Sequence, residues 1–118
     1  MNFTVIGATG FIGRAMVSWL SEQGHAVLAP GRGDELLFSR PLGHVIYAAG
    51  VTADFRSRPF DTLRAHTTLL ADILERASFD SLLYLSSARM YRHSEHTGED
   101  AAVLLRSSDP EDFYDLTK

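Results

Sequence analysis

The chain has 118 residues, 45% of them hydrophobic, and a formal net charge of −4, which is typical of one globular domain. The negative balance argues against nucleic acid as a partner, because phosphate binding needs clustered Lys and Arg, and the lack of cysteine excludes disulfides and cysteine-based metal sites. The first residues lack the basic start of a signal peptide and no apolar run is long enough to span a membrane, so we expect a cytoplasmic protein.

The chain begins with a predicted strand, a glycine-rich turn and a helix. Residues 3–6 form a short apolar run, and apolar residues then recur at helical spacing from residue 11 to about 23. Gly7, Gly10 and Gly13 stand between and at the start of these elements. We expect Gly7 to allow a tight turn, Gly10 to let phosphates approach the backbone, and Gly13 to let the helix pack closely on its strand. Because a helix N-terminus offers unpaired N–H groups to phosphate, this arrangement predicts a dinucleotide site rather than an ordinary turn.

The spacing GxxGxxG, with Ala8, Thr9, Phe11 and Ile12 in the gaps, resembles that of the extended short-chain dehydrogenase/reductase family, the NAD(P)-dependent epimerases, dehydratases and related reductases. The resemblance implies an α/β, Rossmann-like parallel sheet with helices on both faces. It also implies that Thr9, Phe11 and Ile12 bind the cofactor together with the three glycines.

Gly24 is suited to end the first helix, and residues 25–29 predict the second strand. An acidic residue about 20 positions after the glycines would bind the adenosine ribose of NAD, but the sequence has Arg32 in that region. A guanidinium there can pair with a 2′-phosphate, with help from Arg14. We therefore expect NADP rather than NAD as cofactor. NAD remains an alternative cofactor, because Asp34 could reach the ribose. The alternative for Arg14 and Arg32 is that both are solvated surface residues.

Residues 35–42 hold enough apolar side chains for one or two helical turns. The family normally has a helix, a third strand and another helix in this interval, which so few residues cannot form. We predict a truncated fold in which the third strand is missing or vestigial and the second strand lies near a sheet edge.

Residues 44–50 are nearly all apolar, as in a parallel strand buried on both faces. The segment resembles the family's strand that ends in Ala-Gly, which implies that Ala48, Ala49 and Gly50 lie against the cofactor. The alternative is that these small residues serve only packing.

A polar loop at 52–59 precedes a predicted helix at 60–77, whose apolar residues share one face. The family resemblance implies that this helix can pack against a second subunit in a homodimer. The alternative is a crossover helix that covers the sheet. We expect His66 to be a surface residue of this helix rather than a ligand.

Residues 81–91 predict a strand and its exit loop, and they resemble the family's segment with two serines. The resemblance implies that Ser87 is catalytic and that Leu85 binds the cofactor, whereas the alternative is that the serines cap a loop. Residues 92–112 are polar and irregular. His93 and His96 lie there among acidic residues, but we predict no metal site, because exposed loop histidines without further ligands are usually only polar.

The last motif is Tyr114-Asp115-Leu116-Thr117-Lys118, a YxxxK. On a helix, positions four apart share a face, so Tyr114 and Lys118 lie side by side and the ammonium favours the phenolate. We expect Asp109 or Asp112 to start this helix. By resemblance, both Tyr114 and Lys118 are catalytic and also contact the cofactor.

The resemblance covers residues 3–118 and implies one NAD(P)-binding Rossmann domain. Family members are longer and carry a C-terminal substrate domain, so we expect the chain to be the N-terminal part of a larger enzyme and inactive alone. The implied activity is hydride transfer on a small-molecule substrate, a nucleotide sugar or a related hydroxyl or carbonyl compound. Two alternatives are a non-catalytic NAD(P)-binding module and a partner-binding remnant that binds no cofactor.

Overall fold

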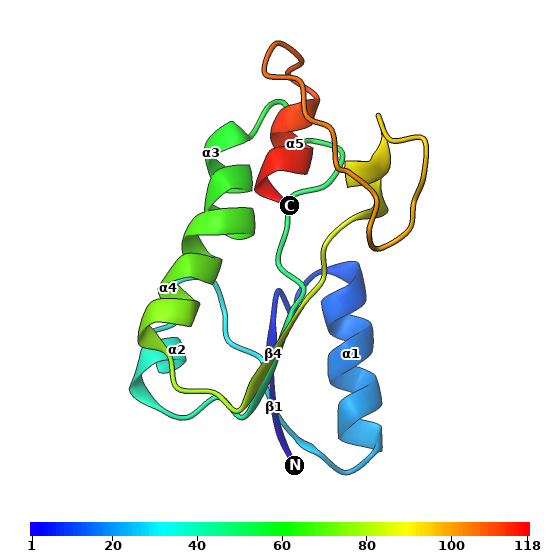
Figure 1. The fold of residues 1–118 in the computed structure, drawn as a ribbon. Coiled ribbons are helices and arrows are strands. Elements are labelled where there is room, and N and C mark those ends of the chain that lie inside the picture. Colours follow the sequence, from blue (N-terminus) through cyan, green and yellow to red (C-terminus); the bar gives the residue numbers. More distant parts are fainter.

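The computed structural model describes residues 1–118 and contains one parallel sheet of four strands with helices on both faces (Figure 1). The strands are β1 (Asn2–Ile6), β2 (Ala26–Leu28), β3 (His44–Tyr47) and β4 (Ser81–Tyr84). Their order across the sheet is β2-β1-β3-β4, and each neighbouring pair is parallel. The predicted α/β fold is therefore confirmed.

Helix α1 (Phe11–Glu22) covers one face of the sheet, and Val5, Leu20 and Ile46 pack between them. The other face is covered by α2 (Leu36–Ser39) and by a long helix made of α3 (Pro59–Leu63), a π-helical turn (Arg64–Thr68) and α4 (Leu69–Arg76). The larger core lies on that face and consists of Ile6, Leu37, Leu42, Val45, Tyr47 and Ile73. Neighbouring residues such as Val5 and Ile6 face opposite sides, because side chains alternate along a strand.

The third strand of the family pattern is missing, as predicted. Only α2 and short loops join β2 to β3, and β2 is an edge strand. The carboxylate of Asp34 accepts a hydrogen bond from the N–H of Leu36, the first residue of α2, at 3.0 Å. One short helix therefore fills the interval, because a strand and a second helix need more residues than it has.

The long helix packs only part of its predicted apolar face on the sheet, because Leu70 and Ala77 contact the larger core but other members of that face do not. Phe60 and Leu74 of the predicted apolar face are 72% and 56% exposed, whereas Thr62, His66 and Ile73 are buried. The prediction of His66 as a surface residue is wrong, since it is 1% exposed. The physical reason is the π-helical turn at 64–68, whose wider winding changes which side chains face the sheet. The homodimer through residues 60–77 stays a prediction.

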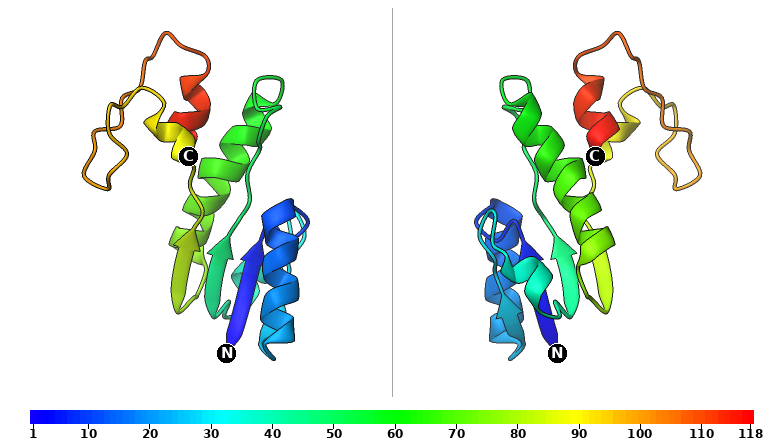
Figure 2. Two further views of the ribbon diagram at one scale, coloured as in Figure 1. Left: turned by 90° about the vertical axis from the view of Figure 1, so that its right-hand side faces the viewer. Right: turned by 90° about the vertical axis from the view of Figure 1, so that its left-hand side faces the viewer.

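After β4 the chain forms a 3₁₀ turn (Ala88–Tyr91), an irregular segment and finally α5 (Asp112–Thr117). Figure 2 shows α5 and this segment beyond the carboxyl ends of the strands, beside α3. A third small core of Val51, Phe55 and Tyr114 joins α5 to the loop after β3. None of the helices combines the length and apolar composition needed to cross a bilayer.

Candidate functional site

The glycine turn after β1 lies against the loop after β3. The chain leaves β1 for α1 and β2 on one side, while β3 and β4 lie on the other side of β1, so this is the switch point at which α/β sheets bind ligands. Gly7 has a φ of +84°, and a Cβ on it would lie 2.6 Å from the Ala49 nitrogen. A Cβ on Gly13 would lie 2.1 Å from the Gly7 oxygen. The tight turn at Gly7 and the close packing at Gly13 are therefore as predicted.

The N-terminus of α1 is open to a ligand. Gly10 precedes the helix, no side chain caps it, and its first turn has no acidic residue. Thr9 is exposed, and Phe11 and Ile12 are 86% and 51% exposed. Because the first N–H groups of a helix have no partner within it, and the helix dipole favours negative charge there, this end of α1 fits a phosphate.

Three segments meet at the carboxyl end of β3. A Cβ on Gly50 would lie 3.3 Å from Lys118 Nζ and 3.2 Å from His66 Nε2. Lys118 Nζ donates a hydrogen bond to the Leu85 oxygen at 2.8 Å, and burial lowers the pKa of Lys118. The structure thus brings Gly50, Leu85 and Lys118 together, with Ala48 and Ala49 between them and the glycine turn.

Tyr114 is buried on the side of α5 that faces the loop after β3. Its ring centroid lies 5.1 Å from those of Phe55 and His66, and the Arg89 guanidinium lies 5.2 Å from it. The backbone N–H of Lys118 donates to the backbone carbonyl oxygen of Tyr114 at 3.1 Å, which is an ordinary helical bond. The Lys118 ammonium itself lies 4.9 Å from the ring centroid of Tyr84, so its expected effect on the Tyr114 phenol stays a prediction.

The two serines after β4 make local hydrogen bonds. The Ser87 hydroxyl accepts from the Arg89 N–H at 3.2 Å and caps the 3₁₀ turn, which is the structural alternative named above. The Ser86 hydroxyl donates to the Lys118 oxygen at 3.0 Å. The catalytic role of Ser87 stays a prediction.

Arg32 lies in the loop after β2, so the strand order places it and Ser87 at opposite edges of the sheet. It is exposed and makes no hydrogen bond or ion pair with other residues of the chain. The carboxylate of Asp34, the residue that kept NAD open, accepts the hydrogen bond from the Leu36 N–H.

A cluster of charged side chains joins the exit of β4 to α5, and the sequence analysis missed it. Arg89 pairs with Glu111 at 2.6 Å, and Arg92 pairs with Asp112. Hydrogen bonds from Arg56 and Arg89 lower the pKa of Glu111 to about 2. We call this set the arginine–carboxylate cluster; its members are Arg56, Arg89, Arg92, His93, Asp109, Glu111, Asp112 and Asp115.

Asp115 is the exception in this cluster, because its carboxylate is buried without a hydrogen bond. Arg89 Nε is 3.4 Å from one carboxylate oxygen but not aligned for a hydrogen bond. Burial raises the pKa of Asp115. The sequence carries a signal for the cluster, because basic side chains concentrate in residues 89–93 and acidic side chains in residues 109–115.

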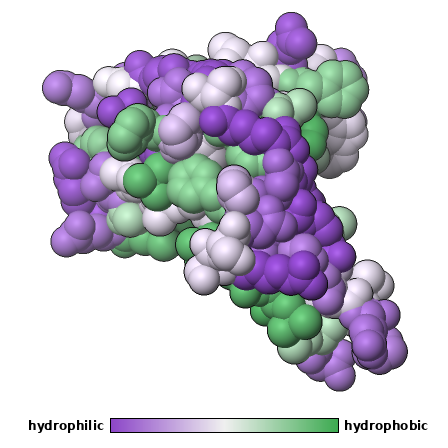
Figure 3. All heavy atoms as spheres, turned by 90° about the horizontal axis from the view of Figure 1, so that it is seen from above, coloured by the Kyte–Doolittle hydropathy of each residue, from purple (hydrophilic) through white to green (hydrophobic).

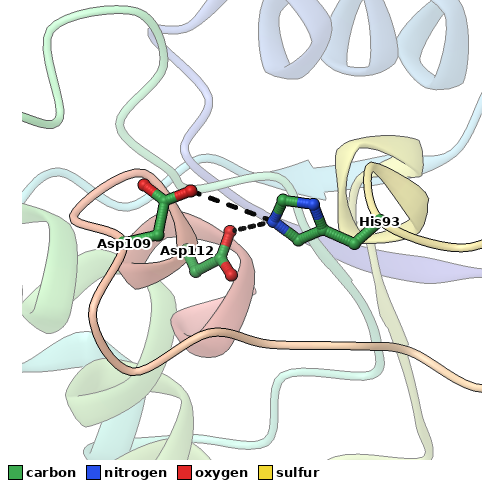
Figure 4. Close-up of side chains that lie close together, drawn as sticks. All are labelled: His93, Asp109 and Asp112. Carbon is green, nitrogen blue, oxygen red and sulfur yellow. Dashed lines mark hydrogen bonds and ion pairs between the residues drawn. The ribbon is translucent and has the colours of Figure 1, made fainter.

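His93, Asp109 and Asp112 point toward one another (Figure 4), and their ligand atoms lie within 4.8 Å. His93 Nε2 is 2.9 Å from the Asp112 carboxylate. The Arg92 guanidinium contacts both carboxylates, so a cation already neutralises them. The three residues are part of the ion-pair network.

Figure 3 views the molecule from above, over the carboxyl ends of the strands, and shows hydrophobic side chains exposed between hydrophilic ones. This end of the sheet carries the glycine turn, Ala49-Gly50, Leu85 and α5.

The sequence model of the NAD dependent epimerase/dehydratase family matches residues 3–118. Among solved structures, a short-chain dehydrogenase/reductase superfamily protein from Agrobacterium tumefaciens, crystallised with bound NAD, matches with a TM-score of 0.69 and 23% identity. The match covers 100% of this chain and 42% of that one, so the chain spans less than half of its structural neighbour. No curated protein matches the chain in sequence. At this identity the structural likeness supports the fold.

Proposed function

The chain belongs to the NAD dependent epimerase/dehydratase family, and we propose that it forms the cofactor-binding part of an NAD(P)-dependent oxidoreductase of the epimerase or dehydratase type. The substrate class we propose is a nucleotide sugar or a related small molecule with a hydroxyl or carbonyl group. The structural neighbour contains NAD, which agrees with this proposal.

The observation that carries the proposal is the position of Lys118. Its ammonium lies beside Gly50 and is held by the Leu85 oxygen, at the end of the sheet that also carries the open N-terminus of α1. Four motifs that are far apart in the sequence thus meet at one end of the sheet: the glycine turn, Ala49-Gly50, the loop that begins at Leu85, and the YxxxK motif of α5. The parallel sheet itself brings the first three together, because each follows a strand; the further support is that α5 brings Lys118 to the same place.

The residues present fit a dinucleotide. The open end of α1 would hold the pyrophosphate, and Ala49 and Gly50 leave room for the nicotinamide side because neither carries a large side chain. The cofactor, when bound, supplies or accepts a hydride at the nicotinamide ring. Lys118 would hold the nicotinamide ribose and keep a positive charge near Tyr114.

Tyr114 would then move a proton to or from the substrate oxygen, and Ser87 would hydrogen-bond that oxygen. For this role the Ser87 hydroxyl can still donate, because it only accepts in its present bond with the Arg89 N–H. Replacing Tyr114 by Phe removes the proton and is expected to abolish turnover in any active form of the protein.

We further propose NADP as the preferred cofactor. The support is that Arg32 is exposed and unpaired, whereas the Asp34 carboxylate already accepts a hydrogen bond from the Leu36 N–H. A guanidinium without a partner can pair with the 2′-phosphate that distinguishes NADP from NAD.

Calorimetric titration of the chain with NADP⁺ and then NAD⁺ tests the proposal. We expect NADP⁺ to bind more tightly. A Gly10→Ala variant is expected to fold but to bind at least tenfold more weakly, because a side chain at this position hinders the close approach of phosphate to the backbone before α1. A Gly98→Ala variant in the exposed loop is the matched control.

The outcomes separate the open alternatives. Binding without turnover by any complete form of the enzyme would favour a non-catalytic nucleotide-binding module. No binding of either cofactor would contradict the proposal and favour a partner-binding role, which size-exclusion mass of the chain would then examine.

A further inference from the structure

His66 joins two parts of the candidate site through both of its ring nitrogens. Its Nε2 accepts a hydrogen bond from the Val51 N–H at 3.1 Å, and its Nδ1 lies 2.9 Å from the Thr117 hydroxyl. Val51 follows Gly50 in the loop after β3, and Thr117 precedes Lys118 in α5. One buried ring therefore connects the Ala-Gly loop to the helix that carries Tyr114 and Lys118.

The protonation state of the ring follows from these bonds. Because Nε2 accepts a backbone N–H, it carries no proton, so in the neutral ring the proton is on Nδ1 and is donated to Thr117. The Thr117 hydroxyl in turn donates a hydrogen bond to the backbone carbonyl oxygen of Phe113 or Tyr114, at 3.1 and 3.0 Å. The chain of donors runs in one direction, from the loop into α5.

The backbone around His66 is also fixed to the sheet. The hydroxyl of Tyr47 donates to the Ala65 oxygen, and that of Tyr84 lies 3.4 Å from the His66 oxygen. Both carbonyls belong to the π-helical turn, where the helical hydrogen-bond pattern changes. The two tyrosines come from β3 and β4, so the position of His66 is set from the strands.

Few other contacts hold this end of α5. The Lys118 ammonium binds the Leu85 oxygen, the Ser86 hydroxyl donates to the Lys118 oxygen at 3.0 Å, and the Thr67 hydroxyl lies at a long 3.4 Å from the Thr117 oxygen. The six residues of α5 are too few to form a stable helix without tertiary contacts. Among these hydrogen bonds, the one between His66 and Thr117 is the one in which a fully buried side chain holds α5.

We propose that His66 is a positioning residue, which holds α5 at the distance from Gly50 that Tyr114 and Lys118 need; the functional meaning of this distance rests on the proposed function. The rings of His66 and Tyr114 pack edge to face, with their centroids 5.1 Å apart and an interplanar angle of 89°. His66 thus supports the reacting side chains without itself meeting substrate or cofactor.

If His66 only filled space, removing the Thr117 hydroxyl would not loosen α5. The test therefore begins with substitutions of Thr117. Thr117→Val keeps the shape of the side chain but removes the hydroxyl, and Thr117→Ser keeps the hydroxyl as the matched control. The two readouts are hydrogen exchange of the Lys118 backbone amide and the pKa of the Lys118 ammonium, both to be followed by NMR without any cofactor.

We expect Thr117→Val to accelerate exchange of the Lys118 amide by about fivefold, the effect of one lost hydrogen bond. The pKa of Lys118 is expected to move up toward its ordinary value, because a looser α5 exposes the ammonium. Exchange of the Ala48 amide, which is bonded to Ile6 in the sheet, should stay unchanged, and Thr117→Ser should resemble the wild type.

Two variants of His66 separate its two bonds. Asn places a donor near the Nδ1 position and keeps the Thr117 bond, whereas Gln places an acceptor near the Nε2 position and keeps the Val51 bond. We expect His66→Asn to protect the Lys118 amide better than His66→Gln does. If either variant fails to fold, the comparison of Thr117→Val with Thr117→Ser decides.

The proposal is overturned if Thr117→Val leaves both Lys118 readouts at wild-type values, or if the Ala48 amide accelerates equally, which would indicate general destabilisation. Because no cofactor is present, failure of the proposed function would leave these readouts untouched. Conversely, normal cofactor binding with unchanged readouts would contradict only the role of His66.

Discussion

The α-carbon of Gly13 lies so close to Gly7 that a Cβ on Gly13 would stand 2.1 Å from the Gly7 oxygen. No real Cβ tolerates this distance to a backbone atom. The first turn of α1 is therefore in direct backbone contact with the turn that leaves β1. This contact places the helix N-terminus beside the Ala49-Gly50 loop.

Gly13→Ala is expected to lower the free energy of unfolding by about 3 kcal/mol, the cost of forcing extra atoms into a packed site. The sign is informative, because Ala in place of Gly inside a helix normally stabilises it by about 1 kcal/mol. Gly10→Ala, whose Cβ would lie 3.3 Å from the same oxygen, is expected to cost far less. Urea unfolding of both variants measures the difference. Equal stabilities would contradict the packing described here.

Arg32→Ala is expected to weaken NADP⁺ binding about tenfold, the effect of losing a charge-assisted hydrogen bond, while NAD⁺ binding stays the same. The physical reason is that only NADP⁺ carries the 2′-phosphate. Calorimetric titration with both cofactors gives the ratio. Arg40→Ala, at another exposed arginine, is the control. An equal loss for both cofactors would instead assign Arg32 to general electrostatic attraction.

Arg92→Gln is expected to release the segment 88–93 from α5, because it leaves the Asp112 and Asp115 carboxylates without one of their cations. We expect a melting temperature several degrees lower at pH 7. The loss should shrink at high salt, since ions screen the exposed members of the cluster. Arg64→Gln, which pairs only with Asp61 on the helix surface at 3.6 Å, is the control and should change little.

The cluster also predicts how stability changes in acid. The pKa values of Glu111 and Asp112 are lowered to about 2 in the folded chain: hydrogen bonds from Arg56 and Arg89 lower that of Glu111, while for Asp112 burial opposes the Arg106 N–H, Arg92 and His93. Carboxyls with a lowered pKa contribute stability above their unfolded values of about 4, and this is lost as pH falls toward 2. Glu111→Gln should therefore flatten the acid limb of the stability curve, measured by urea unfolding from pH 5 to 2. An unchanged limb would contradict the lowered pKa of Glu111.

The strands and the glycine turn were predictable because they are local. Residues 3–6 and 44–50 are apolar in the pattern of buried parallel strands, and only a short element fits between β2 and β3. The face of the long helix was not predictable in the same way. The periodic residues Phe60, Leu63 and Leu74 indicate one face, but the π-helical turn brings His66 to the interior, and no spacing rule for an ordinary helix reveals such a turn.

The same distinction holds within the candidate site. The motif positions were predictable from sequence, since each lies at the end of a strand or on a helix. The contacts that hold them are long-range: His66 meets Thr117, 51 positions away, and Lys118 meets Leu85, 33 positions away. Such pairs depend on the angle at which α5 packs on the sheet, which local sequence does not specify.

His66 gives the last prediction, a loss of stability in mild acid. Burial and the nearby charge of Lys118 lower the pKa of His66 from 6.5 to about 4. As pH falls from 6.5 to 4, the unfolded chain takes up a proton that the folded chain refuses, so folding becomes less favourable by an amount on the order of 3 kcal/mol. Above pH 7 the ring is neutral in both states and the effect is absent. Lys118 is the charged group that lowers this pKa, and burial raises the pKa of Tyr47 and Tyr84, so these two phenols stay neutral in this range.

Urea unfolding of the wild type and His66→Asn at pH 7, 6, 5 and 4.5 measures this effect. The variant cannot take up the proton, so its curve should be flatter, and the gap between the two proteins should narrow as pH falls. His96→Asn, in the exposed loop, should run parallel to the wild type. Parallel curves for the wild type and His66→Asn would mean that His66 titrates alike in both states, which contradicts a buried ring whose Nε2 must stay unprotonated to hold the Val51 N–H.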